Sequence, residues 1–210
     1  MELHVANRTE VGAVASTLAA AFYEDPVWSW VFPEPERRLS QLLALWGLYV
    51  LGGIDHEWVL TTPRYEAAAV WIPPGCVELG EPHASELDPL LDDLLGSRAD
   101  LVREVFSRFD EAHPRGHSYF YLSFLGTHPD HRGMGIGMAL LAEGLSRIDR
   151  QVVPAYLESS NPANLARYES VGFRVHGHFD LPEGGPVVTT MWREPGGPAD
   201  AAPRGTPEDA

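Results

Sequence analysis

The segment 132–137, with the sequence RGMGIG, has the composition of an anion-binding turn. It follows an apolar, aromatic run at 117–127 and precedes the helix-like sequence MALLAEGLSRID. Glycines allow a tight turn whose backbone N–H groups converge, and a helix N-terminus adds a partial positive charge. Such a turn would bind a pyrophosphate. Its spacing differs from the GxxxxGKS/T phosphate loop and from the GxGxxG dinucleotide motif, and a turn shaped only by packing is the alternative.

A second polar turn follows the next apolar run. The sequence PAYLESSNPANLARYESVGF leads from a strand-like segment at 154–159 through Asn161 and Asn164 to a short helix that carries Tyr168. Together with the glycine-rich turn, this arrangement resembles the GNAT acetyltransferase superfamily. In that family an R/Q-x-x-G-x-G/A loop follows the fourth strand, and a later aromatic helix ends in Gly-Phe.

The likeness extends over nearly the whole of 1–196 and is strongest from 117 onward. The segments TLAAAFYEDP, GSR, HPDH and FDLPEGGPVVTTMWREPG, added to the two turns, look like those of puromycin N-acetyltransferase and its actinobacterial relatives. The resemblance is weaker between 30 and 110, on which substrate specificity depends. It implies the GNAT fold, an α/β (α+β) architecture whose mixed, mostly antiparallel sheet of six to seven strands is flanked by helices and splayed between strands 4 and 5.

By this resemblance the co-substrate is acetyl-coenzyme A (acetyl-CoA), held between the strands at 117–127 and 154–159. Two positions depart from the family pattern. Thr127 stands where Val is usual, which leaves backbone pairing intact, and Met134 stands where a basic residue is common, which removes a phosphate contact. The implied coenzyme-binding residues are Leu125, Gly126, Thr127, Arg132, Gly133, Met134, Gly135, Ile136, Gly137, Asn161 and Asn164.

The resemblance also implies catalytic residues. Tyr168 matches the proton donor to the leaving thiolate, and a phenol of pKa about 10 is protonated at neutral pH. Packing of its ring between helix and sheet is the alternative. The attacking amine must be neutral, so a base is expected nearby, and Glu158 beside the splay is the candidate. A carboxylate that only binds the ammonium form is the competing interpretation.

Asp25, Trp28 and Trp30 follow the first predicted helix, where the related enzymes build an acceptor pocket. Two indoles beside a carboxylate suit a cationic or aromatic amine. A loop packed on the core by its tryptophans is equally consistent with this sequence. The HPDH sequence at 128–131 lies within the loop of the family pattern, so no metal is expected there.

The chain has 210 residues and a formal net charge of −15, and all 15 of its basic residues are arginine. An acidic surface repels phosphate backbones and anionic lipid, so neither nucleic acid nor a membrane is an expected partner. Cys76 is the single cysteine, which excludes an intrachain disulfide and a thiolate metal cluster. Since the sequence shows no signal peptide and no apolar span, we expect a cytoplasmic protein, either a monomer or a homodimer.

The periodicity predicts the elements that position these residues. Asp25-Pro26 should end the first helix and lead into a Trp- and Pro-rich loop, and Gly52-Gly53 should end the second helix. Strands are expected at 2–6, 56–62, 66–74, 117–127, 154–159, 173–180 and 186–194, and helices at 11–25, 36–54, 138–149 and 161–172.

The segment 81–111 carries nine acidic residues against three arginines, with helical spacing of its apolar positions. It is expected to be an amphipathic insertion whose charged face is either simply solvated or forms a rim that attracts substrate. One domain is expected over 1–194. The tail at 195–210 has no apolar face to bury and is expected to be disordered.

The expected function is direct transfer of an acetyl group from acetyl-CoA to a primary amine of a small molecule. Puromycin or a related aminonucleoside or antibiotic is the first candidate, and the excess negative charge favours a cationic amine. An acetylase of protein N-termini and a non-catalytic acyl-CoA sensor are the alternatives. Release of free thiol with a panel of amines would separate them.

Overall fold

The computed structural model describes residues 2–196. The tail expected at 195–210 therefore lies, apart from residues 195 and 196, outside the described residues, and the single domain over 1–194 stays a prediction. No helix within 2–196 combines the length and the hydropathy that crossing a membrane requires. The cytoplasmic location and the oligomeric state stay predictions as well.

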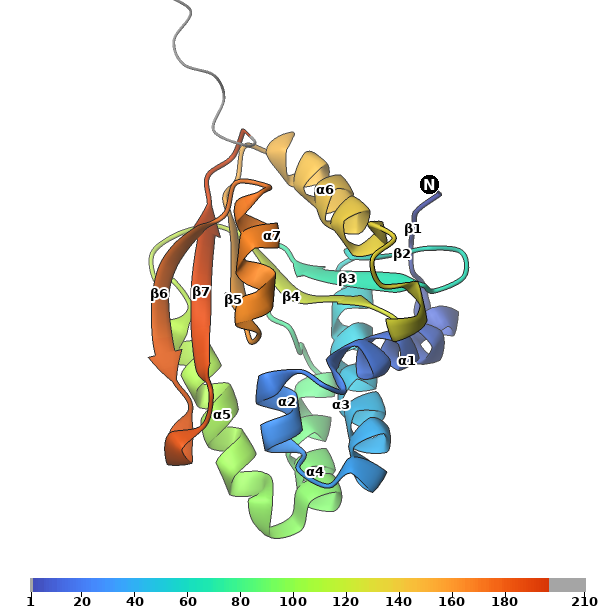
Figure 1. The fold of residues 1–210 in the computed structure, drawn as a ribbon, viewed down its shortest axis with the longest axis vertical. Coiled ribbons are helices and arrows are strands. Elements are labelled where there is room, and N and C mark those ends of the chain that lie inside the picture. Colours follow the sequence, from blue (N-terminus) through green and yellow to red (C-terminus); the bar gives the residue numbers. More distant parts are fainter. Residues whose placement is uncertain (1, 197–210) are drawn as a thin grey trace, which may run out of the picture.

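Seven strands form one sheet in the order β1-β2-β3-β4-β5-β7-β6 (Figure 1). Neighbouring strands are antiparallel except for β4 and β5, which run parallel. The mixed, mostly antiparallel sheet expected from the sequence is therefore confirmed. The strands are β1 (His4–Val5), β2 (Val59–Thr61), β3 (Ala67–Ile72), β4 (Phe120–Thr127), β5 (Ala155–Ser159), β6 (Arg174–Asp180) and β7 (Val187–Arg193).

Strands β4 and β5 pair only over their first halves. The last paired residues are Leu122 and Leu157, although β4 continues to Thr127 and β5 to Ser159. On its other side β4 stays paired with β3 as far as Thr127. The two strands thus separate at Ser123, which produces the expected splay.

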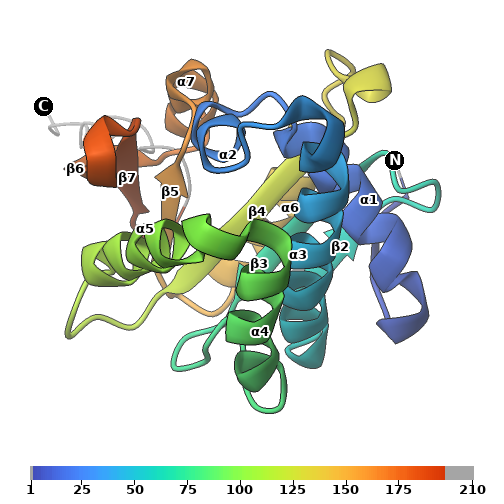
Figure 2. The same ribbon diagram turned by 90° about the horizontal axis from the view of Figure 1, so that it is seen from below.

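Helices cover both faces of the sheet (Figures 1 and 2). Helix α6 packs on β2, β3 and β4 from one face, whereas α1 and α3 pack from the other. The helices are α1 (Val11–Phe22), α2 (Pro26–Val31), α3 (Pro35–Asp55), α4 (His83–Leu95), α5 (Ala99–Ala112), α6 (Ile136–Asp149) and α7 (Leu165–Glu169), and short 3-10 turns occur at Arg8–Glu10, Gly96–Arg98, Pro129–His131, Pro162–Asn164 and Pro182–Gly184.

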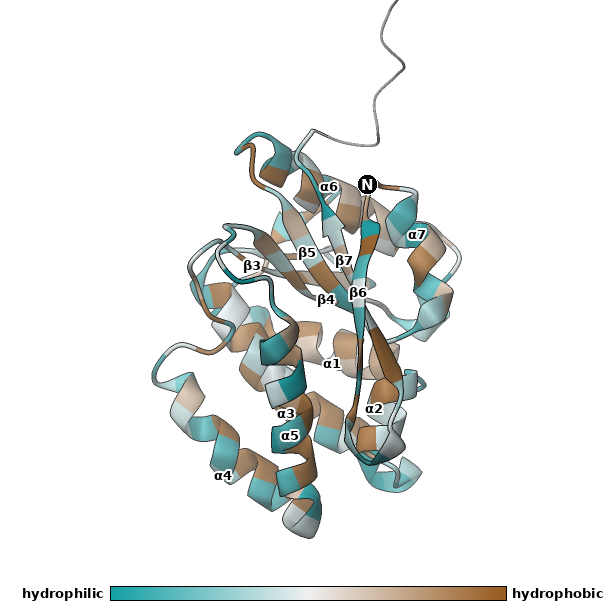
Figure 3. Cartoon of the chain, turned by 90° about the vertical axis from the view of Figure 1, so that its left-hand side faces the viewer, coloured by the Kyte–Doolittle hydropathy of each residue, from teal (hydrophilic) through white to brown (hydrophobic). Residues whose placement is uncertain are grey.

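Strand β3 shows why two helical layers are needed. All six of its residues are buried. Ala69 and Trp71 belong to the core beneath α6, whereas Val70 and Ile72 belong to the core beneath α1 and α3. Period-two alternation sends successive apolar side chains into two separate cores. Strands β3 and β4 are accordingly brown, the colour of hydrophobic residues, in Figure 3.

Helix α3 does not end at Gly52-Gly53, so this prediction was wrong. The helix continues to Asp55. A Cβ on Gly52 would lie 1.9 Å from the carbonyl oxygen of Glu78, and a Cβ on Gly53 would lie 2.5 Å from Cγ1 of Val70. Glycine is required here for close packing, which the sequence cannot distinguish from the glycine that ends a helix.

The loop expected after Asp25 contains the helix α2, so this prediction was also wrong. The Asp25 Oδ1 atom accepts hydrogen bonds from the N–H groups of Val27 (3.0 Å) and Trp28 (3.3 Å), and Pro26 is the first helical residue. An aspartate N-cap followed by proline is a helix start. Because α1 already ends at Phe22, Asp25-Pro26 begins a new helix rather than only breaking the old one.

The acidic insertion forms α4 and α5. Val102 and Val105 of α5 are buried in the core, whereas Arg103 on the outer face forms ion pairs with Asp88 and Asp92 of α4. The charged face is therefore solvated. The apolar face of α5 covers the interior, where it contributes to the site described next.

Candidate active site

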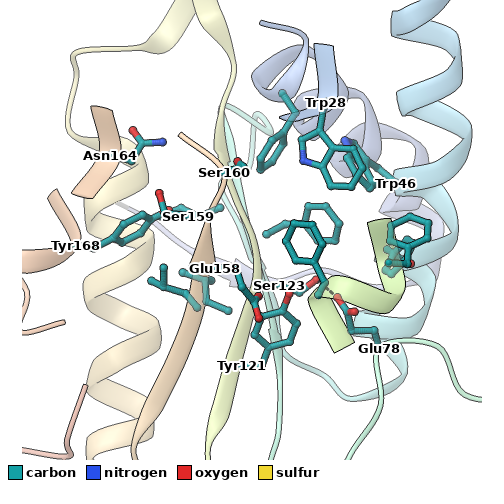
Figure 4. A pocket seen from close by; sticks show the side chains of 18 residues that line it. Trp28, Trp46, Glu78, Tyr121, Ser123, Glu158, Ser159, Ser160, Asn164 and Tyr168 are labelled. Carbon is teal, nitrogen blue, oxygen red and sulfur yellow. Dashed lines mark hydrogen bonds between the residues drawn. The ribbon is translucent and has the colours of Figure 1, made fainter. Parts of the chain in front are cut away.

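Two connected hollows open where β4 and β5 separate. The outer groove runs along the end of α1, strand β4, the loop before α6, and α7. The inner pocket lies among the split strands, α2, α3 and α5 (Figure 4). Phe22, Leu125, Asn164 and Tyr168 line both hollows. A molecule in the groove would therefore meet a molecule in the pocket at these side chains.

The glycine-rich loop forms one wall of the outer groove. Gly133 and Gly135 have φ angles of 79° and 76°, in the left-handed region that favours glycine. Gly135 is the N-cap of α6. Ile136, Gly137 and Met138 line the groove, and N–H groups at these first helical positions have no partner within the helix, whereas the N–H of Ala139 donates to the carbonyl oxygen of Gly135 (3.0 Å). The sequence-based expectation of an anion-binding turn fits this geometry.

Replacing Gly135 with alanine should weaken coenzyme A binding about tenfold. A left-handed conformation costs a non-glycine residue roughly 1–2 kcal/mol, so the turn would relax and its N–H groups would diverge. Isothermal calorimetry with coenzyme A measures the change. Gly47→Ala in α3 is the matched control, because a Cβ there meets no atom within 4 Å. Equal affinity of the Gly135→Ala variant and the wild type would contradict the role of this turn.

The free edge of β4 forms the floor of the outer groove. Pairing with β5 stops at Leu122, so the backbone groups of 123–127 that point away from β3 have no strand partner within the described chain. An extended chain with amide groups fits such an edge as an added strand. Glycine at 126 lets α1 approach this edge, because a Cβ there would lie 2.7 Å from the Cβ of Ala21.

Three basic side chains border the outer groove: His131, Arg132 and Arg167. The Arg132 guanidinium donates a hydrogen bond to the carbonyl oxygen of Ala21 (2.9 Å), which fixes it at the C-terminal end of α1. Arg167 donates to Oδ1 of Asn164. His131 and Arg167 were not predicted, because only the fold brings their segments to one groove. Arg132 and Arg167 thus bring two guanidinium groups to a groove that Glu24 and Asp25 also line.

All predicted coenzyme-binding residues except Met134 line the outer groove. The side chain of Met134 is exposed, at the tip of the loop. Asn161 shapes the turn after β5, because its Oδ1 accepts a hydrogen bond from the N–H of Ala163 (3.0 Å). The residues that line the groove as predicted are Leu125, Gly126, Thr127, Arg132, Gly133, Gly135, Ile136, Gly137, Asn161 and Asn164.

The HPDH segment places His128 and His131 with ring centroids 6.0 Å apart. Asp130 Oδ2 lies 3.6 Å from Nδ1 of His128. Across residues 2–196, no three His, Cys, Asp or Glu side chains gather closely enough to hold a metal ion. The expectation that this segment binds no metal stays a prediction.

Tyr168 on α7 stands at the junction of the two hollows. Its ring meets Phe173 edge-on, with centroids 6.1 Å apart. Burial and, to a smaller extent, the Asp25 carboxylate raise the pKa of its hydroxyl to about 12, against the opposing effect of Arg167. The phenol therefore keeps its proton throughout the neutral range and is available as a donor.

Aromatic side chains form the far wall of the inner pocket. Trp46 of α3 is central: its ring lies 4.6 Å from that of Trp28, at an interplanar angle of 89°, and 4.6 Å from that of Phe124. Phe109 of α5 stacks on Trp28 with centroids 6.3 Å apart. These faces carry the negative end of the ring quadrupole, which attracts cations.

Glu158 of β5 points into the inner pocket (Figure 4). Its side chain is 1% exposed, and neither carboxylate oxygen has a hydrogen-bond partner in the described chain. Burial raises its pKa to about 8, against the effect of the phenols of Tyr156 and Tyr121. A buried carboxylate without a partner is costly, so this group is poised to accept a proton or a cation.

Two ionisable groups near Glu158 were not predicted from the sequence. Nε2 of His113, at the end of α5, lies 3.5 Å from Oε1 of Glu158. Glu78, from the segment after β3, also lines the inner pocket and accepts a hydrogen bond from Ser123. Burial raises the pKa of Glu78 to about 7. Neither segment carries a local motif, so only the tertiary structure identifies them.

The three predicted acceptor residues separate in the structure. Trp28 lines the inner pocket. Asp25 borders the outer groove, with one oxygen capping α2 and the other accepting a hydrogen bond from Ser160 (2.7 Å). Trp30 lines neither hollow and lies against Gly185 of the β6–β7 turn, where a Cβ would come within 2.8 Å of its ring. The structure therefore brings only Trp28 to the acceptor side.

Residues 105–173 match the acetyltransferase (GNAT) family model. The fold is similar to that of a Corynebacterium glutamicum protein described as histone acetyltransferase HPA2 and related acetyltransferase, with 23% identity, a TM-score of 0.63, and coverage of 94% of this chain and 98% of that chain.

An agmatine N-acetyltransferase has 15% identity and a TM-score of 0.62, covering 92% of this chain and 98% of its own. A Drosophila melanogaster polyamine N-acetyltransferase that forms N-acetylagmatine has 17% identity and a TM-score of 0.59, covering 92% of this chain and 99% of its own. These likenesses show the fold.

Proposed function

We propose that the chain is an acetyl-CoA-dependent N-acetyltransferase that acetylates a primary amine of a small molecule, because it has the GNAT fold and residues 105–173 match the family model. One observation carries the proposal: the outer groove and the inner pocket meet at Asn164 and Tyr168. The groove offers backbone and arginine donors to an anion. The pocket offers a cation the buried carboxylate of Glu158, whose nearest basic group is Nε2 of His113 at 3.5 Å.

The outer groove would hold acetyl-CoA. When bound, this co-substrate supplies an activated acetyl thioester. The free edge of β4 at 125–127 would pair with its amide groups, and the N–H groups at the start of α6, with Arg132 and Arg167, would bind its phosphates. The fit rests on the backbone and arginine donors that line the groove. A chain whose net charge is −15 needs such local donors in order to bind a polyanion.

Glu158 prepares the amine for attack. An amine arrives as an ammonium ion, and the carboxylate takes one of its protons so that the nitrogen can form the C–N bond as the C–S bond breaks. The second proton lost by the nitrogen balances the one gained by the departing sulfur. In each turnover one proton therefore leaves through the carboxylate, and one ends on the thiol.

Tyr168 is the donor to the departing sulfur. Its pKa of about 12 lies above the value of about 8.5 that is usual for a thiol, so the phenol holds its proton and stabilises the sulfur through a hydrogen bond. Complete transfer of the proton from Tyr168 to the sulfur is unfavourable unless the second proton lost by the amine reprotonates the phenolate. The position at the junction, rather than the acidity of the phenol, supports this role.

His113 offers the proton on Glu158 a way out. Its Nε2 is 3.5 Å from the carboxylate, and its Nδ1 is 2.9 Å from the hydroxyl of Tyr119. Burial lowers the pKa of His113, so the ring is neutral at neutral pH and would pass the proton on rather than keep it. Glu158 itself has almost no contact with solvent, whereas the His113 side chain is 26% exposed.

Replacing His113 with glutamine is therefore expected to lower kcat at least tenfold and to leave the KM for the amine within about threefold. Added imidazole should restore part of the rate, since it can carry the proton that the ring carried. His117→Gln, at an exposed site of the same loop, is the control. A reduced rate that imidazole does not raise would assign His113 a structural role only.

The experiment that tests the function is free-thiol release from acetyl-CoA with a panel of amines. The panel contains puromycin, other aminonucleosides, arylalkylamines, agmatine, polyamines and a peptide with a free N-terminus. Release with any small amine supports the proposal, and release with the peptide alone supports a protein N-terminal acetylase. Coenzyme A binding without thiol release from any amine would identify an acyl-CoA sensor.

Within this class, puromycin or a related aminonucleoside antibiotic is a candidate on the strength of the motifs along the chain. The aromatic wall of Trp28, Trp46 and Phe109 would pack against an aromatic acceptor. Acetylation of puromycin would make the protein a resistance enzyme. If another amine reacts and puromycin does not, the substrate assignment fails and the acetyltransferase assignment stands.

A further inference from the structure

Glu78 is a second carboxylate of the inner pocket that the transfer chemistry does not use. It comes from the segment between β3 and α4, and it accepts a hydrogen bond from Ser123, the first residue of β4 beyond the paired stretch. In Figure 4, Glu158 lies between Tyr168 and Glu78, so Glu78 marks the end of the pocket remote from the coenzyme groove.

The pocket holds two carboxylates and no cation of its own. None of the residues that line it is an arginine or a histidine, and His113, the nearest base, contacts Glu158 rather than Glu78. Asp110 of α5 adds a further negative charge that acts on both carboxylates. Buried like charges repel each other, so ionisation of both carboxyls in the empty pocket is unfavourable.

The carboxylate of Glu158 is an independent observation that indicates a ligand site in the inner pocket. Both of its oxygens are buried in the pocket and lack a hydrogen-bond partner within residues 2–196. One ammonium group would satisfy Glu158 and leave Glu78 with only the hydroxyl of Ser123 as its donor. A ligand with two cationic groups would compensate both carboxylates at once.

The rest of the pocket suits the middle and the far end of such a ligand. Trp28, Trp46 and Phe106 line it with aromatic surface, which accommodates methylene groups and attracts cations through ring faces. Between the two carboxylates, Figure 4 shows the side chains of Tyr121 and Ser123. The pocket thus combines charge at two points with an apolar wall.

We propose that Glu78 forms a second cation-binding subsite, so that the preferred acceptor is a dicationic amine whose reacting nitrogen lies at Glu158 and whose other charged group lies at Glu78. This inference rests on the proposed function and adds the substrate class. It selects a short aliphatic diamine or an amino-guanidine over a monoamine of the same length. Specificity then comes from a carboxylate that takes no part in the chemistry.

The wild-type enzyme tests the proposal first, with three acceptors of matched length: 1,4-diaminobutane, 4-amino-1-butanol and butylamine. The diamine should have a kcat/KM at least tenfold above that of either monoamine. The hydroxyl compound matters as a probe because it is polar and uncharged at its far end. Equal kcat/KM values for the three would overturn the subsite.

Glu78→Gln is the matching variant, and Glu111→Gln, an exposed position of α5, is the control for loss of one charge. Glu78→Gln should lower kcat/KM for the diamine at least tenfold more than for butylamine, mainly through KM. The control should keep the wild-type preference. Coenzyme A affinity and thermal unfolding check that the variants fold. An unchanged diamine preference in Glu78→Gln would overturn the proposal.

Calorimetric binding of 1,4-diaminobutane in the presence of coenzyme A separates this inference from the proposed function. If no amine releases thiol but the diamine binds and Glu78→Gln weakens that binding at least tenfold, the enzyme assignment fails and the subsite stands. If amines are acetylated and diamine binding is indifferent to Glu78→Gln, the subsite fails and the enzyme assignment stands.

Discussion

Replacement of Tyr168 with phenylalanine is expected to lower kcat about a hundredfold or more, with coenzyme A binding within about twofold of the wild type. The hydroxyl is the proposed donor, on a residue that lines both hollows, and removing it would leave the developing charge on the departing sulfur without its hydrogen bond. The ring itself, packed edge-on against Phe173, would remain in place.

Steady-state thiol release at saturating amine measures this effect, and a burst experiment separates chemistry from product release. Tyr23→Phe is the control, because Tyr23 lines neither hollow and its hydroxyl donates a hydrogen bond to the carbonyl oxygen of Pro35 (3.1 Å). Since the pKa of Tyr168 is about 12, its titration should not shape the rate below about pH 11. Full turnover by Tyr168→Phe would leave Tyr168 with a packing role only.

Replacement of Glu158 with glutamine has the second large expected effect, a loss of kcat of about a hundredfold or more, together with loss of pH dependence. The wild-type carboxyl has a pKa of about 8 in the empty pocket and is active in its ionised form. The rate of the wild type should therefore rise with pH towards 8. Glutamine has no such titration, so the rise should disappear in the variant.

The division between kcat and KM decides between the two roles of Glu158. A base is needed in the transfer step, so its loss appears mainly in kcat, whereas a carboxylate that only binds ammonium affects mainly KM. Glu78, whose pKa is about 7, also titrates in this range, and the Glu78→Gln variant identifies its share. A rise in the KM for the amine with kcat unchanged would exclude Glu158 as the base.

The same substitution should increase stability at higher pH. The folded pKa of Glu158 is raised from 4.5 to about 8, so folding favours the protonated form. That advantage is fully present below pH 4.5 and is lost as pH rises towards 8. Glu158→Gln should therefore unfold at a higher temperature than the wild type near pH 8, and the difference should shrink near pH 5.

The anion-binding turn could be predicted because its signal is local. Gly133 and Gly135 adopt positive φ angles that their own residue type permits, and the helix start follows directly in the chain. Asn161, Asn164 and Tyr168 follow from a strand, a turn and a short helix that are contiguous in sequence. Neighbouring residues of this kind keep their relation in any fold that forms those elements.

The acceptor side could not be predicted in the same way. Its lining residues come from α2, α3, α5 and the segment after β3, which meet only after the sheet and its helices have packed. Trp28 and Trp30 are two positions apart, yet one lines the pocket and the other packs by Gly185, because α2 is a helix and not the expected loop. The prediction that Gly52-Gly53 ends the second helix failed for the same reason, because the role of these glycines depends on Glu78 and Val70, which are distant in sequence.

The sequence by itself determined the elements of the outer groove: a strand, a glycine-rich turn, a helix start and the Asn and Tyr positions after the next strand, all of which depend on backbone preferences of adjacent residues. It also determined the formal net charge of −15. Because such a chain repels polyanions overall, any polyanion must be bound by local donors. The tertiary structure decided the acceptor side. Only packing brought Glu78 into the pocket and His113 to within 3.5 Å of Glu158, and burial then raised the pKa values of the Glu78 and Glu158 carboxylates.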